Sequence, residues 1–388
     1  MRLVDFIKCL GDRVIRQPNE YFIPGHNGPY NDPETLVRNK GHWLITLGWL
    51  SQNISHDKYL DAVVSLADDL SDNDARPYDF SFHHRSQIGK DKCNGLIGQA
   101  WTFEALAHAT LVTQNPKYVE LAEEVFFHHF FNYDSGLWCR LEIDGTVLSI
   151  DSTFNHQLWF AACASLLKTP RLNEIHERII CFLDTLNKNL TVLENGLIYH
   201  PIENQFNGDQ SDLSRKSNLK GVTKSLLNFL RIRFKNNHDV MKQKREKMIY
   251  KSVGYHQFNM YAFAMLKETL PDHLFWKSSE LRASVDYLIS DQFNIDLSEN
   301  IYGFPYNPPG FEVPYVFSVF TDIHEDKLVE ICSWWVNEQF KRCYNQKTGM
   351  MDRNTNDPLT HTARIYELTR LPISILERIE IDMQTIDN

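Results

Sequence analysis

The sequence lacks long hydrophobic runs and closely spaced cysteines. No stretch approaches the ~18 consecutive apolar residues of a transmembrane helix, so we expect no membrane span. The seven cysteines are scattered and include no CxxC pair, which is typical of reduced thiols rather than of a zinc site or a disulfide framework. Residues 1–17 have helical apolar spacing and lack the apolar core of a signal peptide, which indicates a cytoplasmic protein.

The chain also lacks an excess of positive charge and the common cofactor motifs. With 40 Lys and Arg against 50 Asp and Glu, its net charge is −10, which argues against nonspecific nucleic-acid binding. It contains no HExxH zinc motif, no calcium loop, no glycine-rich phosphate loop after a strand and no GxSxG elbow. We therefore expect neither a metal nor an organic cofactor.

One segment departs from the acidic average. Residues 215–251 hold twelve Lys and Arg against two acids, Asp239 and Glu246. Such a run is usually a solvated helix face with its connecting loop, and the alternative is a docking patch for an anionic partner. The sequence leaves both interpretations open.

Strands are hard to find, whereas apolar helical segments recur, each beginning with a polar ring or amide. The marker residues lie at intervals of 57, 57, 100 and 105: His42, Gln99, His156, His256 and His361. A period of roughly 50 to 57 residues accommodates two helices and two connections, so each repeat is a helical hairpin. Missing members would fall near residues 206 and 309.

About six such hairpins fill residues 1–388 as a single domain. If the apolar helices close into an inner ring and the amphipathic ones cover it, the fold is all-α, an (α/α)6 barrel, with the markers near the starts of the inner helices. An open superhelix of stacked pairs is the alternative, but it favours a tighter period and fewer aromatics than the 12% found here.

In such a ring the polar helix starts would face a common mouth. Aromatic faces and fixed hydrogen-bonding groups are what a sugar site needs, although each aromatic alone more often packs in the core. The candidate substrate contacts are Trp43, Trp101, Trp159, Tyr255 and Gln99.

Asp151 opens the segment "DSTFNHQLWFAA" and is the candidate general acid. Burial against Phe154 and Trp159 would raise its pKa for that role, and the alternative role is a helix cap. Asn94 has the equivalent position one hairpin earlier. His84 and Arg85 precede that earlier helix and are candidates for substrate binding or proton transfer.

"SIDSTFNHQLWFAACA" resembles a segment of unsaturated glucuronyl hydrolases and related six-hairpin glycosidases. The shared pattern is Asp-x-x-x-Asn-x-x-Leu-x-x-x-Ala, here Asp151, Asn155, Leu158 and Ala162. The resemblance implies that Asp151 protonates an unsaturated uronic acid. A second aspartate of those hydrolases has its nearest match in Asn94, which cannot ionise.

More broadly, most of the chain resembles AglQ-type proteins, which are encoded among glycosylation and surface-polysaccharide genes. The segments that carry this resemblance are "DPETLVRNKGHWLITLGWL", "CNGLIGQAWTFEALAHA", "YHQFNMYAFAMLKE", "YGFPYNPPGFEVPYV" and "DPLTHTARIYEL".

The leading functional hypothesis is a carbohydrate-active enzyme, glycosidase-like or hydratase-like, that acts on an acidic saccharide. The alternatives are a sugar epimerase of the N-acylglucosamine 2-epimerase sort, in which His156 and His256 transfer protons, and a non-catalytic saccharide-binding scaffold. An acidic substrate needs a basic side chain near Asp151, and the candidates are Arg38, Arg85 and Arg364.

Overall fold

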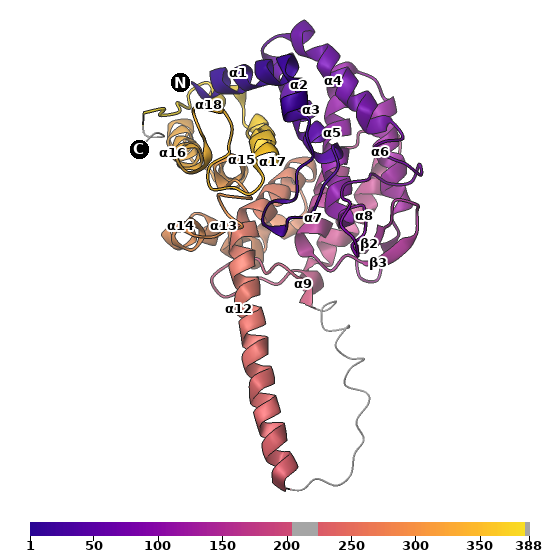
Figure 1. The fold of residues 1–388 in the computed structure, drawn as a ribbon, viewed down its shortest axis with the longest axis vertical. Coiled ribbons are helices and arrows are strands. Elements are labelled where there is room, and N and C mark those ends of the chain that lie inside the picture. The colour runs from indigo at the N-terminus through magenta and orange to yellow at the C-terminus, as the bar shows by residue number, and fades with distance from the viewer. Residues whose placement is uncertain (204–223, 385–388) are drawn as a thin grey trace.

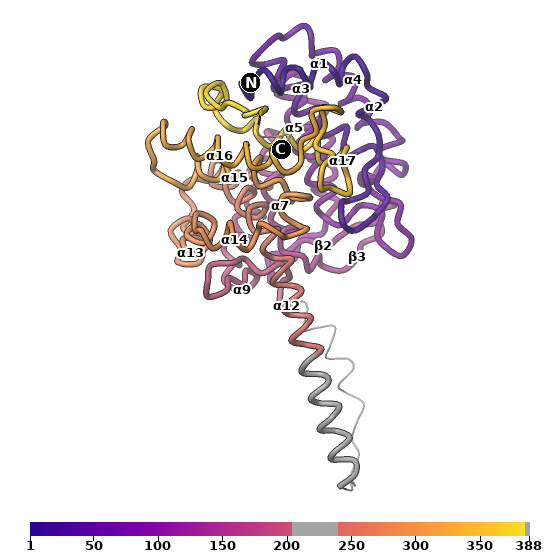
Figure 2. Tube along the Cα trace, turned by 60° about the vertical axis from the view of Figure 1, so that its left-hand side comes forward, coloured from indigo at the N-terminus to yellow at the C-terminus, as the bar shows by residue number. Residues whose placement is uncertain are grey.

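The computed structural model describes residues 1–203 and 224–384, with side chains described for all of these except 224–239. The chain is mostly helical, and its most apolar helices form a closed inner ring in which each packs on the next and the last packs on the first. Figures 1 and 2 show this ring from two directions. In chain order its members are α3 (Val37–Asn53), α5 (Gly95–Thr113), α7 (Phe154–Ala164), α12 (Lys224–Thr269), α15 (Pro309–Phe320) and α17 (Pro358–Ala363) with η3 (Arg364–Arg370).

A second layer of helices covers the ring because the inner helices are apolar nearly all round, whereas these have one apolar stripe. The outer helices are α1 (Leu3–Arg16), α4 (His56–Ser71), α6 (Lys117–His128), α8 (Leu172–Asp184), α13 (Ser279–Leu288), α14 (Asp291–Ser298) and α16 (Glu325–Cys343). Short elements connect the layers: α2 (Pro18–Tyr21), η1 (Gly28–Tyr30), α9 (Leu186–Asn189), η2 (Leu274–Lys277) and α18 (Ile373–Leu376). The all-α barrel expected from the repeat is thus confirmed.

A small antiparallel sheet precedes α7, which the sequence did not indicate. Its strands are β1 (Phe131–Asn132), β2 (Leu137–Leu141) and β3 (Val147–Ile150), in the order β1-β2-β3. Phe131 pairs with Trp138, and Cys139 pairs with Ile150. Asp151 follows β3 directly, so the sheet delivers this residue to the start of α7.

Buried glutamines attach the inner helices to the chain that leads into them. Gln157 accepts a hydrogen bond from the Trp138 amide at 2.9 Å and donates to the Trp138 carbonyl at 2.8 Å. Gln99 does the same with Phe82, at 2.8 and 2.9 Å. These amides therefore satisfy backbone groups that would otherwise be buried without partners.

Four of the five marker residues lie in the first two turns of an inner helix, and His256 is the exception. It belongs to the 46-residue helix α12, which begins at Lys224, so its predicted place at a helix start is wrong. The expected helix near residue 309 is α15, and residue 206 lies outside the described residues. Of the basic segment, residues 215–223 also lie outside them, while residues 240–247 are solvent-exposed or half-exposed.

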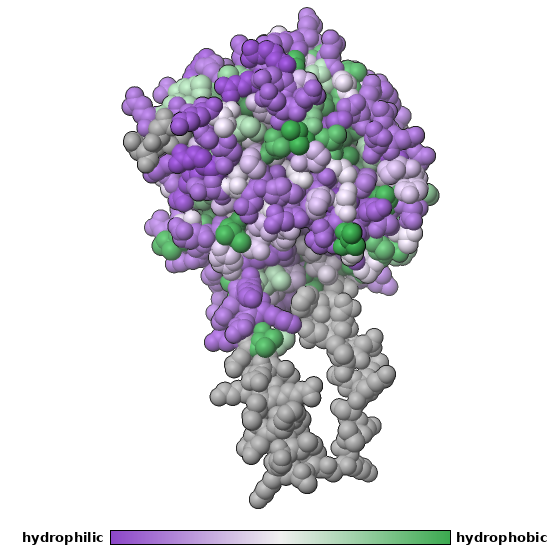
Figure 3. All heavy atoms as spheres, in the orientation of Figure 1, coloured by the Kyte–Doolittle hydropathy of each residue, from purple (hydrophilic) through white to green (hydrophobic). Residues whose placement is uncertain are grey.

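The chain ends lie together on the outer layer (Figures 1 and 2), where Arg2 forms an isolated bridge with Glu380. One hydrophobic cluster runs from Leu3 to Ile381, and the single-domain assignment stays a prediction. On the face in Figure 3, apolar side chains are scattered among polar ones, as is ordinary for a protein surface. In the part of the chain that the structure describes, no helix combines the length and the apolar character needed to cross a membrane.

A buried charge cluster joins α15 to η3. The Arg364 guanidinium binds the carboxylates of Glu312 and Glu367 and donates to the Tyr306 carbonyl at 3.0 Å. The side chains of Arg364, Glu312 and Glu367 are 3%, 0% and 1% exposed. Burial raises the pKa of both carboxyls, whereas Arg364 lowers it. Removing the arginine would leave acidic groups buried without a counter-charge.

We expect Arg364→Met to cost about 3 to 5 kcal/mol of unfolding free energy, because it removes the guanidinium that binds both buried carboxyls. Urea denaturation of the purified protein measures this. The control is Arg378→Gln, which breaks two exposed ion pairs with Glu325 and Asp326 and should change little. Equal stability of the two variants would contradict the role given to Arg364.

Candidate functional site

A polar cavity of about 160 Å³ lies at the N-terminal ends of α3, α5 and α7 and beside the later part of α12. The helices α3, α5, α7 and α12 each contribute described lining residues, and connecting loops contribute the rest. The lining consists of Asn27, Tyr30, Asp32, Arg38, Arg85, Lys90, Asn94, Ile97, Trp101, Thr153, Asn155, His156, His200, Lys251, Tyr255, Phe258, Tyr306 and Asn307.

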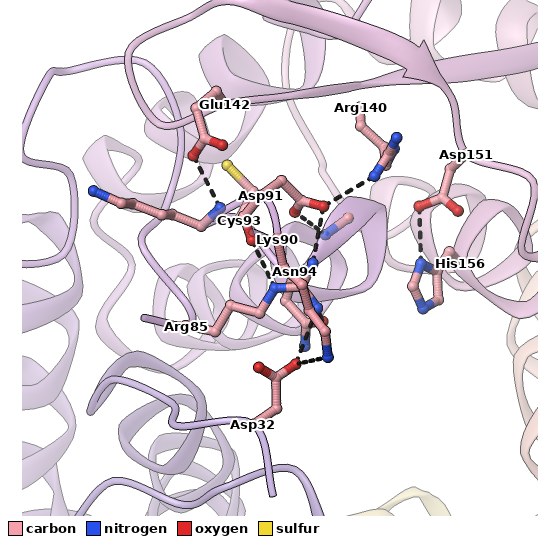
Figure 4. Close-up of polar contacts among 12 residues, drawn as sticks. Asp32, Arg85, Lys90, Asp91, Cys93, Asn94, Arg140, Glu142, Asp151 and His156 are labelled. Atoms are coloured by element: carbon pink, nitrogen blue, oxygen red, sulfur yellow. Dashed lines mark hydrogen bonds and ion pairs between the residues drawn. The ribbon is translucent and has the colours of Figure 1, made fainter. Parts of the chain in front are cut away.

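His156 lies on this lining and is held from behind by Asp151 (Figure 4). The His156 Nδ1 atom is 2.8 Å from Asp151 Oδ2, which also accepts from the Leu96 amide at 3.2 Å. The other carboxylate oxygen accepts from the Thr153 amide at 3.1 Å. The side chains of His156 and Asp151 are 23% and 5% exposed, so the imidazole is the member of the pair that meets the cavity.

Gly95 makes room for this pair. Its φ is +58°, and a Cβ there would lie 2.5 Å from Asp151 Oδ2 and 2.8 Å from His156 Nδ1. Asn94, the preceding residue, is also left-handed at φ 57° and caps α5. An L-residue at position 95 would therefore be strained and would displace the carboxylate.

Asp151 is ionised at neutral pH. Burial opposes this, but the attraction of His156 and the hydrogen bonds from His156, Thr153 and Leu96 outweigh it and lower the pKa to about 2. The raised pKa expected from the sequence is therefore wrong. The apolar neighbours are present, but backbone amides and an imidazole compensate the charge. An ionised Asp151 accepts the Nδ1 proton of His156 and leaves Nε2 as the free nitrogen.

A charged network occupies the side of the cavity near α5 (Figure 4). Arg85 contacts Asp32 at 3.1 Å, Asp91 at 2.9 Å and the Asn94 side-chain oxygen at 2.9 Å. Lys90 also binds Asp32, at 3.0 Å. These contacts hold Asn94 as an acceptor for Arg85 and fix the Arg85 guanidinium at the cavity wall.

Arg38 forms the neighbouring part of the wall. It pairs with buried Glu34 at 2.9 Å, donates to His42 Nε2 at 3.2 Å, and lies 3.8 Å above the Trp101 ring. The aromatic face and the carboxylate both stabilise the guanidinium in this buried position. Trp101 is therefore occupied on one face by Arg38.

Lys251 differs from the other cations of the cavity. In the part of the chain that the structure describes, no carboxylate lies within ion-pair distance of its ammonium, which instead lies 5.1 Å from the Tyr30 ring and 5.4 Å from the Tyr255 ring. Burial and the nearby Lys90 lower the pKa of Lys251 to about 8. The Tyr30 and Tyr255 hydroxyls are 2.9 Å apart and hydrogen-bonded.

His200 is a second imidazole on the lining. Its carbonyl accepts from the Phe154 amide at 3.0 Å, which places it beside the start of α7, and its ring lies 4.6 Å from that of Tyr255. Burial, Lys251 and His156 lower its pKa well below the ordinary value, so this ring is neutral at pH 7. The cavity thus combines two imidazoles with several cations.

The structure brings six predicted site residues to the lining: Asn94, His156, Arg38, Arg85, Trp101 and Tyr255. Asp151 lies directly behind it. The other predicted contacts do not line this cavity, and their packing explains why.

Trp43 and Trp159 are fully buried, and Trp159 stacks on Phe258 at 4.3 Å and donates its indole N–H to the Phe258 carbonyl. They are core residues, which was the alternative for any single aromatic. The Gln99 side chain is hydrogen-bonded to the Phe82 backbone, as described above.

His84 bonds to Thr102 Oγ1 at 2.9 Å inside the barrel. His256 accepts from the Ile198 amide and contacts the Ser284 carbonyl at 3.0 Å, with 0% exposure. Arg364 belongs to the buried cluster with Glu312. These three predicted roles are corrected here, because the hydrogen-bonding groups of each side chain are directed into the protein interior.

Sequence reasoning missed the contribution of the loops. Asn27, Tyr30 and Asp32 come from "HNGPYND", a turn-rich stretch whose polar and aromatic composition was the available signal. The other lining residues that were not predicted as site residues are Lys90, Ile97, Thr153, Asn155, His200, Lys251, Phe258, Tyr306 and Asn307. Lys251 is the last residue of the basic segment, and the others meet only when the ring closes. Within the described residues, no group of three or more His, Cys, Asp or Glu could hold a metal ion.

The ring and its cavity define a helical toroid of six hairpins, and comparison with solved structures supports this class. A sugar epimerase from a ruminal bacterium matches with a TM-score of 0.60 at 10% identity, covering 95% of this chain and 98% of that one. A D-mannose isomerase matches at 0.56 and 9%, with the same coverage. A GH76 α-mannanase from Bacteroides thetaiotaomicron matches at 0.51 and 12%, covering 94% of each chain. At these identities the likeness shows the fold alone.

The chain belongs to the family of archaeal glycosylation protein Q. It is 38% identical over 351 residues to the protein of that name from Haloferax volcanii, which covers 89% of this chain and 91% of the relative. No family model matches the sequence.

We expect Asp151→Asn to lower the unfolding free energy by about 2 kcal/mol at pH 6. The pKa of Asp151 is about 2 in the folded protein and higher in the unfolded chain, so ionisation of this carboxyl stabilises the folded state. This stability is present above pH ~4 and is lost as the pH falls toward 2. Denaturant titrations of both proteins between pH 3 and 6 measure the difference. A difference that stays constant with pH would contradict the low pKa.

Proposed function

We propose that this protein is a carbohydrate-active enzyme that epimerises or isomerises an acidic sugar by proton transfer, with His156 as the base. One observation carries the proposal: the Asp151–His156 pair faces a cavity whose wall also holds Arg38, Arg85, Lys90 and Lys251. The glycosylation protein Q relative and the fold shared with an epimerase and an isomerase are in keeping with it.

The pair supplies a base of fixed orientation. Because Asp151 accepts the Nδ1 proton, His156 Nε2 is free to remove a proton from a sugar carbon next to a carbonyl. The C–H electron pair then moves into the carbonyl and forms an enediolate. Return of a proton to the opposite face of the same carbon gives the epimer. Return to the neighbouring carbon, while the hydroxyl proton moves to the former carbonyl oxygen, gives the isomer.

The cavity cations have two roles in this proposal. They stabilise the negative oxygen of the enediolate, and they bind the carboxylate of the substrate. Lys251 is the best anchor for the substrate carboxylate, since Arg38, Arg85 and Lys90 already bind protein carboxylates. His200 replaces His256 as the second imidazole, because His200 lines the cavity and His256 lies in the core.

Glycoside hydrolysis has less support from the same geometry. It commonly requires two carboxyl groups at the reaction centre, one of them protonated. In the part of the lining that the structure describes, Asp32 is the one carboxylate, and Arg85 and Lys90 bind it. Asp151, the predicted acid, has a pKa of about 2 and lies behind His156. Proton transfer by imidazole therefore fits these residues better.

The proton transfer predicts solvent exchange. Incubation with hexuronates (D-glucuronate, D-galacturonate and D-mannuronate) in D2O should place deuterium on the carbon next to the carbonyl, as read by NMR. His156→Gln should slow this exchange at least ~100-fold because it removes the base. Asp151→Asn should slow it about 100-fold or more, because His156 is then no longer held in the tautomer whose Nε2 can accept a proton.

The matched control is His256→Gln, a buried histidine outside the lining, which should retain exchange per folded molecule. Binding of hexuronates without any exchange would instead support the non-catalytic scaffold and contradict the enzyme.

The carboxylate anchor predicts a charge-selective loss. Lys251→Met should weaken D-glucuronate binding about 10-fold at pH 7, through loss of a charge-assisted hydrogen bond, and should leave D-glucose binding within about twofold. With a pKa of about 8, Lys251 loses its charge as the pH rises, so wild-type affinity for glucuronate should fall between pH 7 and 9. Calorimetric titration measures both. An equal loss for the two sugars would remove Lys251 as the anchor.

A further inference from the structure

A second and larger cavity lies at the opposite end of the barrel. It encloses about 470 Å³, within the ordinary size range of small-molecule sites, against about 160 Å³ for the first cavity. Its lining comes from the C-terminal parts of α3, α5 and α12, from the residues that follow α7, from α6 and from η3. The lining residues include Ile45, Trp49, Glu104, Ala107, His108, Leu111, Val119, Leu166, Tyr366 and Arg370.

The lining combines apolar walls with buried polar groups. Ile45, Trp49, Leu111, Val119 and Leu166 are apolar lining residues, and Leu111 remains 51% exposed although it is a large apolar side chain. A large apolar side chain that stays exposed within a concavity is a feature of surfaces that bind a partner or ligand.

Four polar residues of this lining each keep a buried side-chain atom that has no hydrogen-bond partner among the described residues. These atoms are Glu104 Oε2, His108 Nε2, Tyr366 Oη and Arg370 Nε. A buried polar group without a partner costs about 1 to 3 kcal/mol, so such groups call for an explanation. Each belongs to a side chain that lines the cavity.

The charge of the cavity indicates an uncharged ligand. Glu104 pairs with Arg370 at 2.5 Å, so these two charges offset each other, and the remaining charged lining residue, Lys168, is exposed to solvent. His108 is neutral, since burial and Arg370 lower its pKa to about 4. The unpaired atoms comprise an acceptor on Glu104, a donor on Arg370, a hydroxyl on Tyr366 and an imidazole nitrogen on His108. Hydroxyl groups both donate and accept, and therefore match this set.

We propose that this second cavity is a binding site for an uncharged, hydroxylated molecule with an apolar body, such as a glycoside of an aliphatic alcohol. The hydroxyls pair with the groups of Glu104, Tyr366 and Arg370, and the apolar body packs on Trp49 and Leu111. The site is separate from the cavity of His156, and the proposal does not depend on the reaction assigned there.

The probe is octyl β-D-glucoside below its micelle-forming concentration, titrated by calorimetry into the full-length protein. Glucose, 1-octanol and octanoate test the head group, the apolar chain and the effect of charge. We expect saturable binding of the glucoside at least tenfold tighter than that of glucose, octanol or octanoate. No saturable binding, or binding that octanol or octanoate matches, overturns the proposal.

Two substitutions locate the binding. Ala107→Phe fills the cavity and should weaken glucoside binding at least tenfold, whereas His156→Gln in the other cavity should leave it unchanged. An Ala107→Phe protein that binds as well as wild type overturns the assignment to this cavity.

Tyr366→Phe is the conservative test. Its hydroxyl has no partner in the described part of the chain, so its removal should leave the unfolding free energy unchanged or higher while weakening glucoside binding about fivefold or more. The matched control is Tyr261→Phe, whose hydroxyl donates to the Glu367 carbonyl at 3.0 Å. This variant should lose stability and keep its affinity for the glucoside. The reverse pattern overturns the role of Tyr366 as a ligand contact.

Discussion

The carboxylate of Asp151 connects three parts of the site. It accepts from the Leu96 amide at the start of α5, from the Thr153 amide before α7, and from His156 on α7. Neighbouring inner helices are therefore joined at their N-termini by one anionic group, where the helix dipoles also favour negative charge. The orientation of His156 depends on this carboxylate, since Asp151 Oδ2 accepts hydrogen bonds from both the Leu96 amide and the His156 imidazole.

Under the proposed function, this arrangement would allow an acidic protein to bind an acidic sugar. The whole chain carries a net charge of −10, but the described lining of the cavity has more cations, Arg38, Arg85, Lys90 and Lys251, than carboxylates, of which Asp32 is the one present. Glu34, Asp32 and Asp91 lie next to the cations and lower the cost of burying Arg38 and Arg85. Because the N-termini of α5 and α7 point to the same space, their dipoles add to the positive potential. In the proposed function, a substrate anion would complete a site whose charges are otherwise largely paired.

The sequence was enough to predict the barrel, because a repeat of polar-headed apolar helices is a property of local pattern. It also placed Asp151 beside His156 and brought Arg38, Arg85, Asn94 and Tyr255 to one cavity. What it could not give was the orientation of each polar side chain. His156 and His256 both precede a glutamine, yet one faces the cavity and the other bonds to the backbone of Ile198.

The missed residues share a different cause. Tyr30, Lys251 and Tyr306 are far apart in the chain, and their contact depends on how the loops fold over the ring. The pKa of Asp151 was missed for a related reason: its apolar neighbours were visible in the sequence, but the amides of Leu96 and Thr153 that stabilise its charge were not. Local sequence predicts burial better than it predicts how a buried charge is compensated.

Polar side chains are buried at several positions along the barrel axis. Burying them costs free energy in a protein interior. Arg38 bonds to His42, and the His42 ring stacks on Tyr366 at 4.6 Å, so side chains in contact lead from the first cavity to the second. An aliphatic axis would tolerate rotation or sliding of one helix against the next, because apolar packing has little directionality. Directional bonds such as those of Arg38 and Arg364 hold only when the inner helices keep one register. That register also sets the position of His156 relative to the loop residues of the first cavity. The polar contacts along the barrel axis therefore determine the geometry of that cavity.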